Sequence, residues 1–200
     1  MILITRPKEE SRLLRDKLEI LGMDVATDIL SRFRIRKNKQ KWTTKKIFLI
    51  SSPRAADIFI NKKILNFQNA FLIIGKKSES KLIKAGYKNI IHTAINSEKM
   101  FHYLKNKFRN NTAYNFNNIV YLTSTVGNQT FQIKLNRIGI QKKIIYETFY
   151  KKNLNKETIT LIKKNKISVC LVFSKNNANH LVRLFNKHKL KNPAEKIIFI

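Results

Sequence analysis

Residues 47–59 read IFLISSPRAADIF, and the fold can be predicted outward from this stretch. A short apolar run passes through two serines, a proline and an arginine into apolar residues at helical spacing. A run this short and this uniformly apolar is typical of a strand buried on both faces of a parallel sheet. Pro53 suits a first helical turn, because the N–H that proline lacks has no partner there. The stretch therefore predicts a strand, a tight turn and a helix.

Three more stretches repeat this plan of an apolar run, Ser or Thr, and a helical pattern. They are MILITRPKEESRLLRDKL (1–18), IVYLTSTVGNQTFQIKL (119–135) and VCLVFSKNNANHLVRLF (169–185). FLIIGKKSESKLIKAGY (71–87) forms another strand–turn–helix unit, and SEKMFHYLKNKF (97–108) another helix. Gly22, Gly86 and Gly139 fall where C-terminal helix caps are expected. Strands that alternate with helices predict an α/β fold with parallel sheets.

Two stretches depart from the plan: LSRFRIRKN (30–38) and KKIIYETFYKK (142–152) alternate like strands and lead into no helix. They are either edge strands of one sheet or connectors that cross between two lobes. As connectors, they predict a first lobe of residues 1–30 plus 151–200 and a second lobe of residues 37–143. The connector strands would then be residues 31–36 and 144–150.

The chain is strongly basic, with 41 Lys and Arg against 12 Asp and Glu and a formal net charge of +29. The excess is mostly Lys, scattered among abundant Asn and Ile, a mixture that AT-rich coding produces without selection on the protein. Such charge attracts polyanions in general. A basic α/β module that binds RNA or DNA is therefore one alternative function, although no clustered basic helix supports it.

Several classes of protein are disfavoured. No apolar run approaches the roughly 20 residues that span a bilayer, and the N-terminus lacks the features of a signal peptide. The single cysteine, Cys170, lies inside ISVCLVF and is expected to pack in a core. Nucleotide-loop and metal-ligand motifs are absent, and the four histidines are dispersed. We therefore expect a cytoplasmic protein with no membrane association and no metal.

Hydroxyl side chains recur where the predicted strands end. These residues are Thr5, Ser51, Ser52, Thr123, Ser124, Thr125 and Ser174. Ligands of α/β sheets bind beyond the carboxyl ends of the strands, where helix N-termini attract anions. The simpler alternative is that each hydroxyl only caps a helix. Together they predict a site that holds several carboxylates or phosphates and has little acid–base machinery.

With these elements in place, FLISSPRAADIF (48–59), preceded by ILITRP (2–7) and followed by IIYETFYK (144–151), resembles the uroporphyrinogen-III synthase family. FLIIGKKSESKLIKAGY is similar to the family pattern xxxVGxxTAxxLxxxG, and VFSKNNANHL (172–181) is similar to its second FTSPSAxxxL turn. The resemblance runs through nearly the entire chain in order. Departures are Ser78 and Glu79 for Thr-Ala, Lys175 for a proline, and the absence of an arginine from TSTVGNQ (123–129).

The family continues beyond the point that corresponds to KIIFI (196–200) into another turn, helix and strand. We therefore expect a first lobe that is incomplete toward its C-terminal part. A degenerate homologue that folds without catalysing the reaction is a further alternative.

The resemblance implies two parallel-sheet α/β lobes, the first discontinuous in sequence, joined by a two-stranded β connector, with the substrate in the cleft between them. That substrate is hydroxymethylbilane, a linear tetrapyrrole with an acetate and a propionate on every ring. The enzyme removes its terminal hydroxyl as water, inverts the last ring and closes the macrocycle to uroporphyrinogen III. The resemblance implies no cofactor and no metal, and we expect a monomer.

Tyr146, in the family's YxT segment, is the predicted catalytic residue, because a phenol can donate to the leaving hydroxyl. We expect it beside the cleft and outside either core; packing of its ring, or a role for Tyr150 instead, are the alternatives. Arg54 stands in a first helical turn, where a cation is electrostatically unfavourable; contact with a ligand is one explanation, and a solvated arginine is the alternative. The expected substrate-binding residues are Thr5, Arg6, Ser51, Ser52, Arg54, Gly75, Lys76, Ser78, Thr123, Ser124, Gly127, Ser174 and Asn176.

Overall fold

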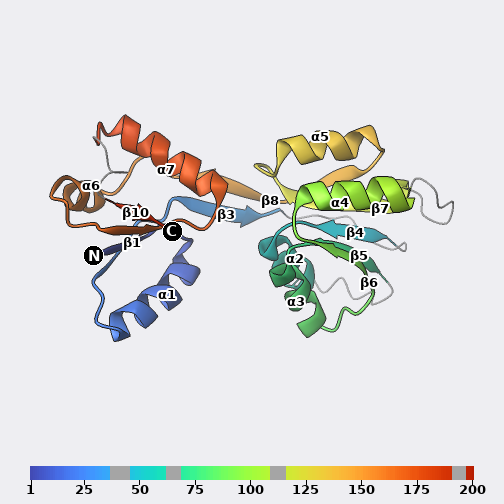
Figure 1. Cartoon of the computed structure of the whole chain (residues 1–200), viewed down its shortest axis with the longest axis horizontal. Coiled ribbons are helices and arrows are strands. Elements are labelled where there is room, and N and C mark those ends of the chain that lie inside the picture. Colours follow the sequence, from blue (N-terminus) through green and yellow to red (C-terminus); the bar gives the residue numbers. More distant parts are fainter. Residues whose placement is uncertain (37–45, 62–68, 109–115, 191–196) are drawn as a thin grey trace. The chain divides into compact units, whose positions relative to one another are not determined.

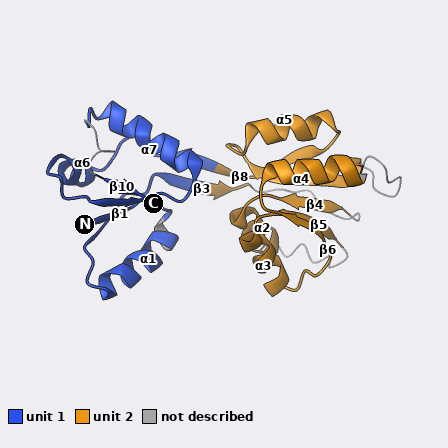
Figure 2. Ribbon diagram, viewed as in Figure 1, with its two compact units in different colours: residues 1–33, 148–200 blue, residues 34–147 orange. Residues whose placement is uncertain are grey.

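The chain divides into two compact units, which the computed structural model describes over most of their length. Unit 1 comprises Met1–Phe33 and Thr148–Ile200, and unit 2 comprises Arg34–Glu147 (Figure 2). The described residues are 1–36, 46–61, 69–108, 116–190 and 197–200 (Figure 1). The first residues of the second lobe expected from the sequence, 37–45, lie outside the described residues.

Unit 1 contains a four-stranded sheet in the order β10-β9-β1-β2, and every neighbouring pair in it is parallel. Its strands are β1 (Ile2–Ile4), β2 (Val25–Thr27), β9 (Val169–Leu171) and β10 (Ile198–Phe199). Its helices are α1 (Lys8–Ile20), α6 (Lys156–Lys163) and α7 (Lys175–Lys187). Figure 1 shows α1 and α7 on opposite sides of this sheet.

The core of unit 1 joins β1 and β9 to α6 and α7. Leu3 and Cys170 from the strands pack in one buried cluster with Leu181 and Phe185 of α7. Cys170 is completely buried, as expected, and burial raises the pKa of its thiol to about 12. A thiol with so high a pKa carries almost no thiolate at neutral pH, so it packs as a small apolar group.

Unit 2 is built on a six-stranded sheet in the order β3-β8-β7-β4-β5-β6. Its strands are β3 (Ser31–Ile35), β4 (Ile47–Ile50), β5 (Ala70–Ile74), β6 (Ile90–Ala94), β7 (Ile119–Ser124) and β8 (Gln141–Tyr150). Its helices are α2 (Pro53–Asn61), α3 (Lys76–Lys84), α4 (Ser97–Tyr103) and α5 (Gln129–Arg137), with a π-helical turn at Leu104–Phe108 and a 3-10 turn at Phe116–Asn118.

The central strand β4 supplies one residue to each face of this sheet in turn. Phe48 and Ile50 belong to the core under α2 and α3, whereas Ile47 and Leu49 belong to the core under α4 and α5. All four residues are buried, which explains why the strand is uniformly apolar and does not alternate with polar residues.

An aromatic cluster fills the core under α2 and α3. Phe59 of α2 is 1% exposed, and its ring centroid lies 4.8 Å from that of Phe48, 5.3 Å from that of Phe71 and 5.5 Å from that of Tyr87. The pairs with Phe71 and Tyr87 are edge-to-face, the arrangement that the ring quadrupoles favour. Phe59 is thus the central aromatic contact between α2 and the sheet.

The boundary between the units falls within β3 and β8, which are neighbours in the six-stranded sheet. Two arginines of this region clamp one carboxylate of β8. Arg34 Nη2 lies 2.6 Å from Glu147 Oε2, and Arg36 Nη2 lies 2.7 Å from Glu147 Oε1. Hydrogen bonds from Arg34, and then from Arg36, lower the pKa of Glu147 below its usual value.

Replacing Glu147 by Gln is expected to flatten the acid side of the stability profile. A lowered pKa in the folded state stabilises the fold above the ordinary pKa of about 4.5, and this contribution is lost as the pH falls through the lowered pKa. The melting temperature of the natural chain should therefore fall more steeply below about pH 5 than that of Glu147→Gln. The two melting temperatures should therefore differ at neutral pH and converge in acid, and the difference should be modest because Arg34 is largely exposed. Parallel profiles would contradict the clamp.

The mixed α/β fold with predominantly parallel sheets is confirmed. Among the strands and α-helices, three were not expected from the sequence: the strands β2 and β6 and the helix α6. Strand β2 is only half-buried and brief, so its pattern is too short to reveal a period. Gly22, Gly86 and Gly139 follow helices with φ of 73°, 92° and 83°, as expected for caps.

Candidate functional site

The site in unit 2 is organised around the carboxyl end of β4, where Ser51 and Ser52 follow Ile50. Successive residues of an extended chain point to opposite faces of a sheet. Accordingly, Ser51 Oγ is hydrogen-bonded to Tyr121 Oη at 2.9 Å, whereas Ser52 Oγ lies 3.4 Å from Tyr146 Oη. Two adjacent serines thus pair with two tyrosines, one from β7 and one from β8, and these four residues form the serine–tyrosine group.

The two tyrosines belong to different cores of unit 2. Tyr121 is 1% exposed and packs edge-on against Phe131 in the core under α4 and α5. Tyr146 is 8% exposed and packs in the core under α2 and α3. Because a buried phenol needs a hydrogen-bond partner for its hydroxyl, each ring directs its polar end toward a serine at the end of β4.

The expectation that Tyr146 lies outside either core is wrong. A register shift between β7 and β8 causes the difference: Thr123 pairs with Ile144, but Ser124 pairs with Tyr146. The strand pairing skips Ile145 at this irregularity, and both Ile145 and Tyr146 are buried in the same core. Only the hydroxyl end of Tyr146 reaches Ser52.

Ser52 also caps α2, because the Ala55 N–H donates to its Oγ at 3.1 Å. Arg54 is the second residue of this helix and is partly buried. The Thr125 N–H donates to the Tyr146 carbonyl oxygen at 3.3 Å, which ties the loop after β7 to β8. These bonds bring Ser52 and Tyr146 together within unit 2, with Arg54 in the first turn of the adjoining helix.

The turn after β7 leaves no room for a side chain at Gly127. A Cβ there would lie 2.3 Å from Thr123 Oγ1 and 2.6 Å from Gln132 Nε2, both too close for real atoms. Thr123 and Ser124 are 4% and 6% exposed, so their side chains support this turn from inside. The turn is closed by the Gly127 N–H, which donates to the Ser124 carbonyl oxygen at 3.3 Å.

Three of the expected site residues lie around the turn between β5 and α3. Gly75 has φ of 89°, a conformation that other residues rarely adopt, and its N–H donates to the Ala94 carbonyl oxygen at 2.9 Å. Lys76 is exposed at the start of α3. Ser78 is 1% exposed, and its hydroxyl has no hydrogen-bond partner among the described residues. Because its side chain is buried, Ser78 is a poor candidate for contact with a substrate.

The remaining expected residues lie in unit 1. Thr5 is completely buried, and its hydroxyl donates to the Leu171 carbonyl oxygen at 2.8 Å, so it joins β1 to β9. The guanidinium of Arg6 lies 4.1 Å above the ring of Phe173 and forms an ion pair with Glu10. Glu10 would compete with a substrate carboxylate for this cation.

Ser174 and Asn176 occupy the N-terminus of α7. The Ser174 hydroxyl oxygen accepts from the Asn177 N–H at 3.2 Å, which is a helix cap. Asn176 is exposed in the first turn. For Ser52 and Ser174, the capping role foreseen as the simpler alternative is therefore present, and ligand binding would come in addition to it.

Tyr121 was not predicted from the sequence. It stands in an apolar strand, where a tyrosine usually indicates only core packing. The available signal was its partner: a serine follows the end of the neighbouring strand, and a buried phenol requires a hydrogen-bonding group within reach. Tyr121 fixes the orientation of the Ser51 hydroxyl, and so belongs to the candidate site.

The described residues offer neither a metal site nor a membrane span. Among them, no three His, Cys, Asp or Glu side chains gather in a way that could bind a metal ion. In the same part of the chain, no helix combines the length and the apolar character needed to cross a bilayer.

Comparison with known proteins gives one family. The profile of uroporphyrinogen-III synthase HemD matches residues 34–199. A uroporphyrinogen III synthase variant from Thermus thermophilus is similar in fold, with a TM-score of 0.66 and 10% identity over 100% of this chain and 83% of that one. Uroporphyrinogen-III synthetase from Helicobacter pylori has a TM-score of 0.54 and 16% identity over 92% of this chain and 78% of that one. No curated protein matches the chain in sequence.

Proposed function

We propose, from the premise that this chain belongs to the uroporphyrinogen-III synthase family, that it cyclises hydroxymethylbilane to uroporphyrinogen III with loss of water and inversion of the last pyrrole ring. Family membership assigns the chain to tetrapyrrole biosynthesis, and the resemblance noted in the sequence is confirmed. The main support for the proposed reaction is the family match over residues 34–199. The matched range includes every residue of the serine–tyrosine group.

The chemistry of the substrate fits the groups at the end of β4. A linear tetrapyrrole with two carboxylates on each ring is a polyanion, and a chain of net charge +29 attracts it. Ring closure itself needs little acid–base help, so the main task is to hold the chain in the bent conformation that joins the correct carbons. Hydroxyls and helix N-termini are suited to this, because they bind carboxylates in fixed directions.

Within this proposal Tyr146 donates to the departing hydroxyl of the bilane. Its phenol lies 3.4 Å from Ser52 Oγ, a distance at which either hydroxyl can orient the other. Ser51, oriented by Tyr121 at 2.9 Å, supplies a second hydroxyl on the other side of the strand. Both serines therefore present hydroxyls whose direction is set by a buried phenol rather than by solvent.

Analysis of the product isomer tests the proposal. Hydroxymethylbilane generated enzymatically closes unaided to the type I isomer, so formation of type III reports catalysis with ring inversion. We expect the chain to convert the bilane mainly to type III. If only type I forms at the uncatalysed rate with folded protein, the chain is the non-catalytic homologue; if it also shifts arbitrary RNA in a salt-dependent manner, the nucleic-acid alternative gains support.

Arg54→Ala is expected to raise the Michaelis constant for hydroxymethylbilane about tenfold at low salt, with little change in turnover. A charge-assisted contact with a substrate carboxylate typically contributes about 1.5–3 kcal/mol, of which part is screened as ionic strength rises. Steady-state kinetics at two salt concentrations measure the effect.

The matched control is Arg137→Ala, which removes an exposed cation from the last turn of α5 in the same unit. It changes the net charge equally and should leave the Michaelis constant nearly unchanged. Equal effects of the two substitutions would assign the loss to overall charge and remove Arg54 from the site.

The proposal also includes the setting in which the chain acts. We propose that it works as a monomer in the cytoplasm, and that nucleic acids bind it only through nonspecific charge attraction. The substrate then reaches the site from solution, so its rate of encounter should fall as ionic strength rises.

A further inference from the structure

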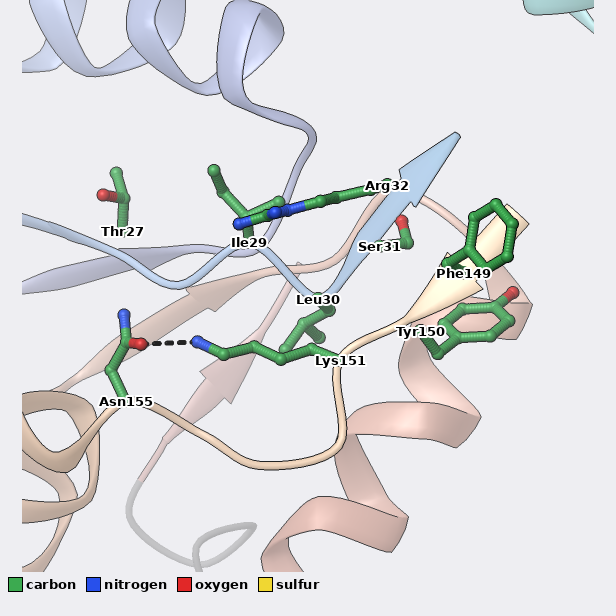
Figure 3. Close-up of a pocket in the computed structure, with 9 residues that line it drawn as sticks. All are labelled: Thr27, Ile29, Leu30, Ser31, Arg32, Phe149, Tyr150, Lys151 and Asn155. Carbon is green, nitrogen blue, oxygen red and sulfur yellow. Dashed lines mark hydrogen bonds between the residues drawn. The ribbon is translucent and has the colours of Figure 1, made fainter. Parts of the chain in front are cut away.

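Unit 1 contains a cavity of about 430 Å³ that the serine–tyrosine group does not use. It lies where β2 runs into β3 and where β8 ends, and all of its lining belongs to unit 1. Its nine lining residues, drawn in Figure 3, are Thr27, Ile29, Leu30, Ser31, Arg32, Phe149, Tyr150, Lys151 and Asn155.

The charge of the lining has one sign. Arg32 and Lys151 are cations, and none of the nine residues carries a carboxylate. Figure 3 shows their side chains extending in the same direction on either side of Leu30. Arg32 is exposed and offers a guanidinium, the group that binds a carboxylate through two parallel hydrogen bonds.

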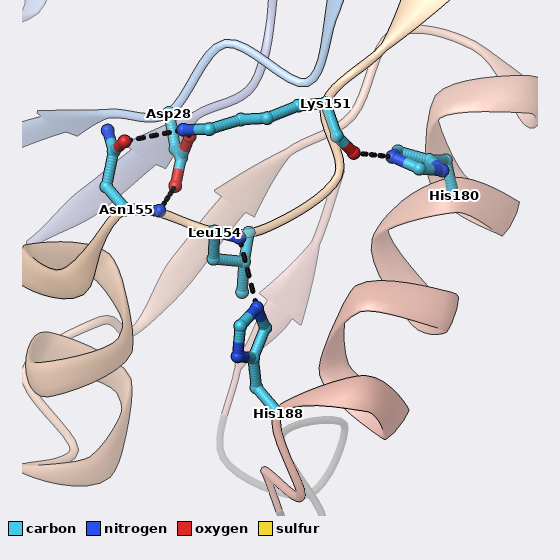
Figure 4. Close-up of polar contacts among 6 residues, drawn as sticks. All are labelled: Asp28, Lys151, Leu154, Asn155, His180 and His188. Carbon is cyan, nitrogen blue, oxygen red and sulfur yellow. Dashed lines mark hydrogen bonds and ion pairs between the residues drawn. The ribbon is translucent and has the colours of Figure 1, made fainter.

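The ammonium group of Lys151 is held in place by Asp28 and Asn155. Its Nζ lies 2.5 Å from Asp28 Oδ1 and 2.5 Å from Asn155 Oδ1, and the Asp28 side chain is completely buried (Figure 4). An ammonium group has three N–H donors, and these two contacts use two of them. The third donor is available to a ligand, while the buried carboxylate keeps the ammonium from moving into solvent.

The backbone of the segment from Lys151 to Asn155 is also fixed by hydrogen bonds. His180 of α7 donates from Nε2 to the Lys151 carbonyl oxygen at 2.7 Å, and the Leu154 N–H donates to His188 Nε2 at 3.2 Å (Figure 4). The Asn155 N–H donates to Asp28 Oδ2 at 2.8 Å. Because its backbone is already held, this segment loses little conformational freedom when a ligand binds.

Apolar and aromatic side chains line another part of the cavity. Ile29 is partly buried and Phe149 is half exposed, so both side chains are accessible to an occupant. The ring of Tyr150 packs against the His180 ring with 4.8 Å between centroids. An occupant should therefore combine a charged head with a flat or compact apolar body.

We propose that this cavity binds an organic carboxylate, whose head group contacts Arg32 and Lys151 and whose apolar body packs on Ile29 and Phe149. Its volume lies within the range of roughly 300–1,000 Å³ that is usual for small-molecule sites. The carboxylate comes either from a free small acid or from a side chain of the bilane; only the second source rests on the proposed function.

Benzoate is the probe, titrated into the full chain and followed by two-dimensional NMR of the backbone amides. We expect saturable shifts at residues of the cavity and binding about tenfold weaker in Arg32→Gln, since a charge-assisted bond is lost. Arg183→Gln, which removes an exposed cation of α7 in the same unit, is the matched control and should bind as the natural chain does. Benzamide, which has the ring but no charge, should bind at least about tenfold more weakly.

Equal affinities of Arg32→Gln and Arg183→Gln, or no saturable benzoate shifts in the cavity, would overturn the proposal. Arg32 is exposed, so its replacement is not expected to disturb folding, and Arg32→Lys should restore part of the affinity.

Kinetics with hydroxymethylbilane distinguish the two sources of the carboxylate. A raised Michaelis constant in Arg32→Gln identifies a bilane carboxylate as the occupant, and an unchanged constant with lost benzoate binding identifies a free acid. Binding of benzoate does not depend on turnover, so an inactive chain would leave this test intact.

Discussion

Tyr146→Phe is expected to lower the turnover of hydroxymethylbilane about 100-fold while the protein remains folded. General acid help is typically worth about 10²–10⁴-fold, and a substrate that loses water readily needs the lower end of that range. The substitution removes only the hydroxyl, which lies 3.4 Å from Ser52 Oγ, and keeps the ring in its core. Stopped assays of product formation give the rate, and the ratio of type III to type I should persist.

Two further tyrosines serve as controls for this result. Tyr103→Phe keeps the ring that stacks at 3.8 Å on His92, and it should retain full turnover. Tyr150→Phe tests the competing candidate on the same strand. Full activity of Tyr146→Phe would return this residue to a packing role, and a large loss in Tyr150→Phe alone would transfer the donor role to Tyr150.

Phe59→Ala is expected to reduce the free energy of unfolding by about 3–5 kcal/mol, because a large buried ring is removed and the cavity collapses only in part. Its ring contacts Phe48, Phe71 and Tyr87 within the core under α2 and α3. Since Tyr146 packs in the same core, the substitution should also lower activity through disorder of the β4 end. Urea unfolding measures the loss.

Ile133→Ala, at a half-exposed position on α5 of the same unit, is the control and should cost less than about 0.5 kcal/mol. A loss below about 1 kcal/mol in Phe59→Ala would mean that neighbouring rings refill the space. The aromatic cluster would then not be what holds α2 against the sheet.

The sequence by itself determined the architecture of each unit. The run at Ile47–Ile50 is short and uniformly apolar, because both faces of a central parallel strand are buried, and this pattern is visible without a structure. The ordered motifs around it also predicted the family, which the match over residues 34–199 confirmed. Strands β2 and β6 and helix α6 escaped prediction because their local patterns are short or weak.

The sequence also predicted that Ser51 and Ser52 stand at a strand end, but only the tertiary structure decided which groups meet them. Tyr121 lies 70 residues from Ser51 along the chain, and Tyr146 lies 94 residues from Ser52. Their approach depends on the strand order and on the irregularity at Ser124, which turns Tyr146 inward. A register shift leaves no local mark on hydrophobic periodicity, because it arises from how two strands pair and not from either strand alone.

The cavity of unit 1 became visible only in the folded chain for the same reason. Its cations, Arg32 and Lys151, come from segments that are distant in sequence. Each segment alone has the sequence of an ordinary basic strand end and does not indicate a site. Lys151 is braced by Asp28, which stands 123 residues before it and is completely buried. A buried carboxylate needs a partner of opposite charge, but which lysine supplies that charge is decided by how the strands are placed and not by any local pattern.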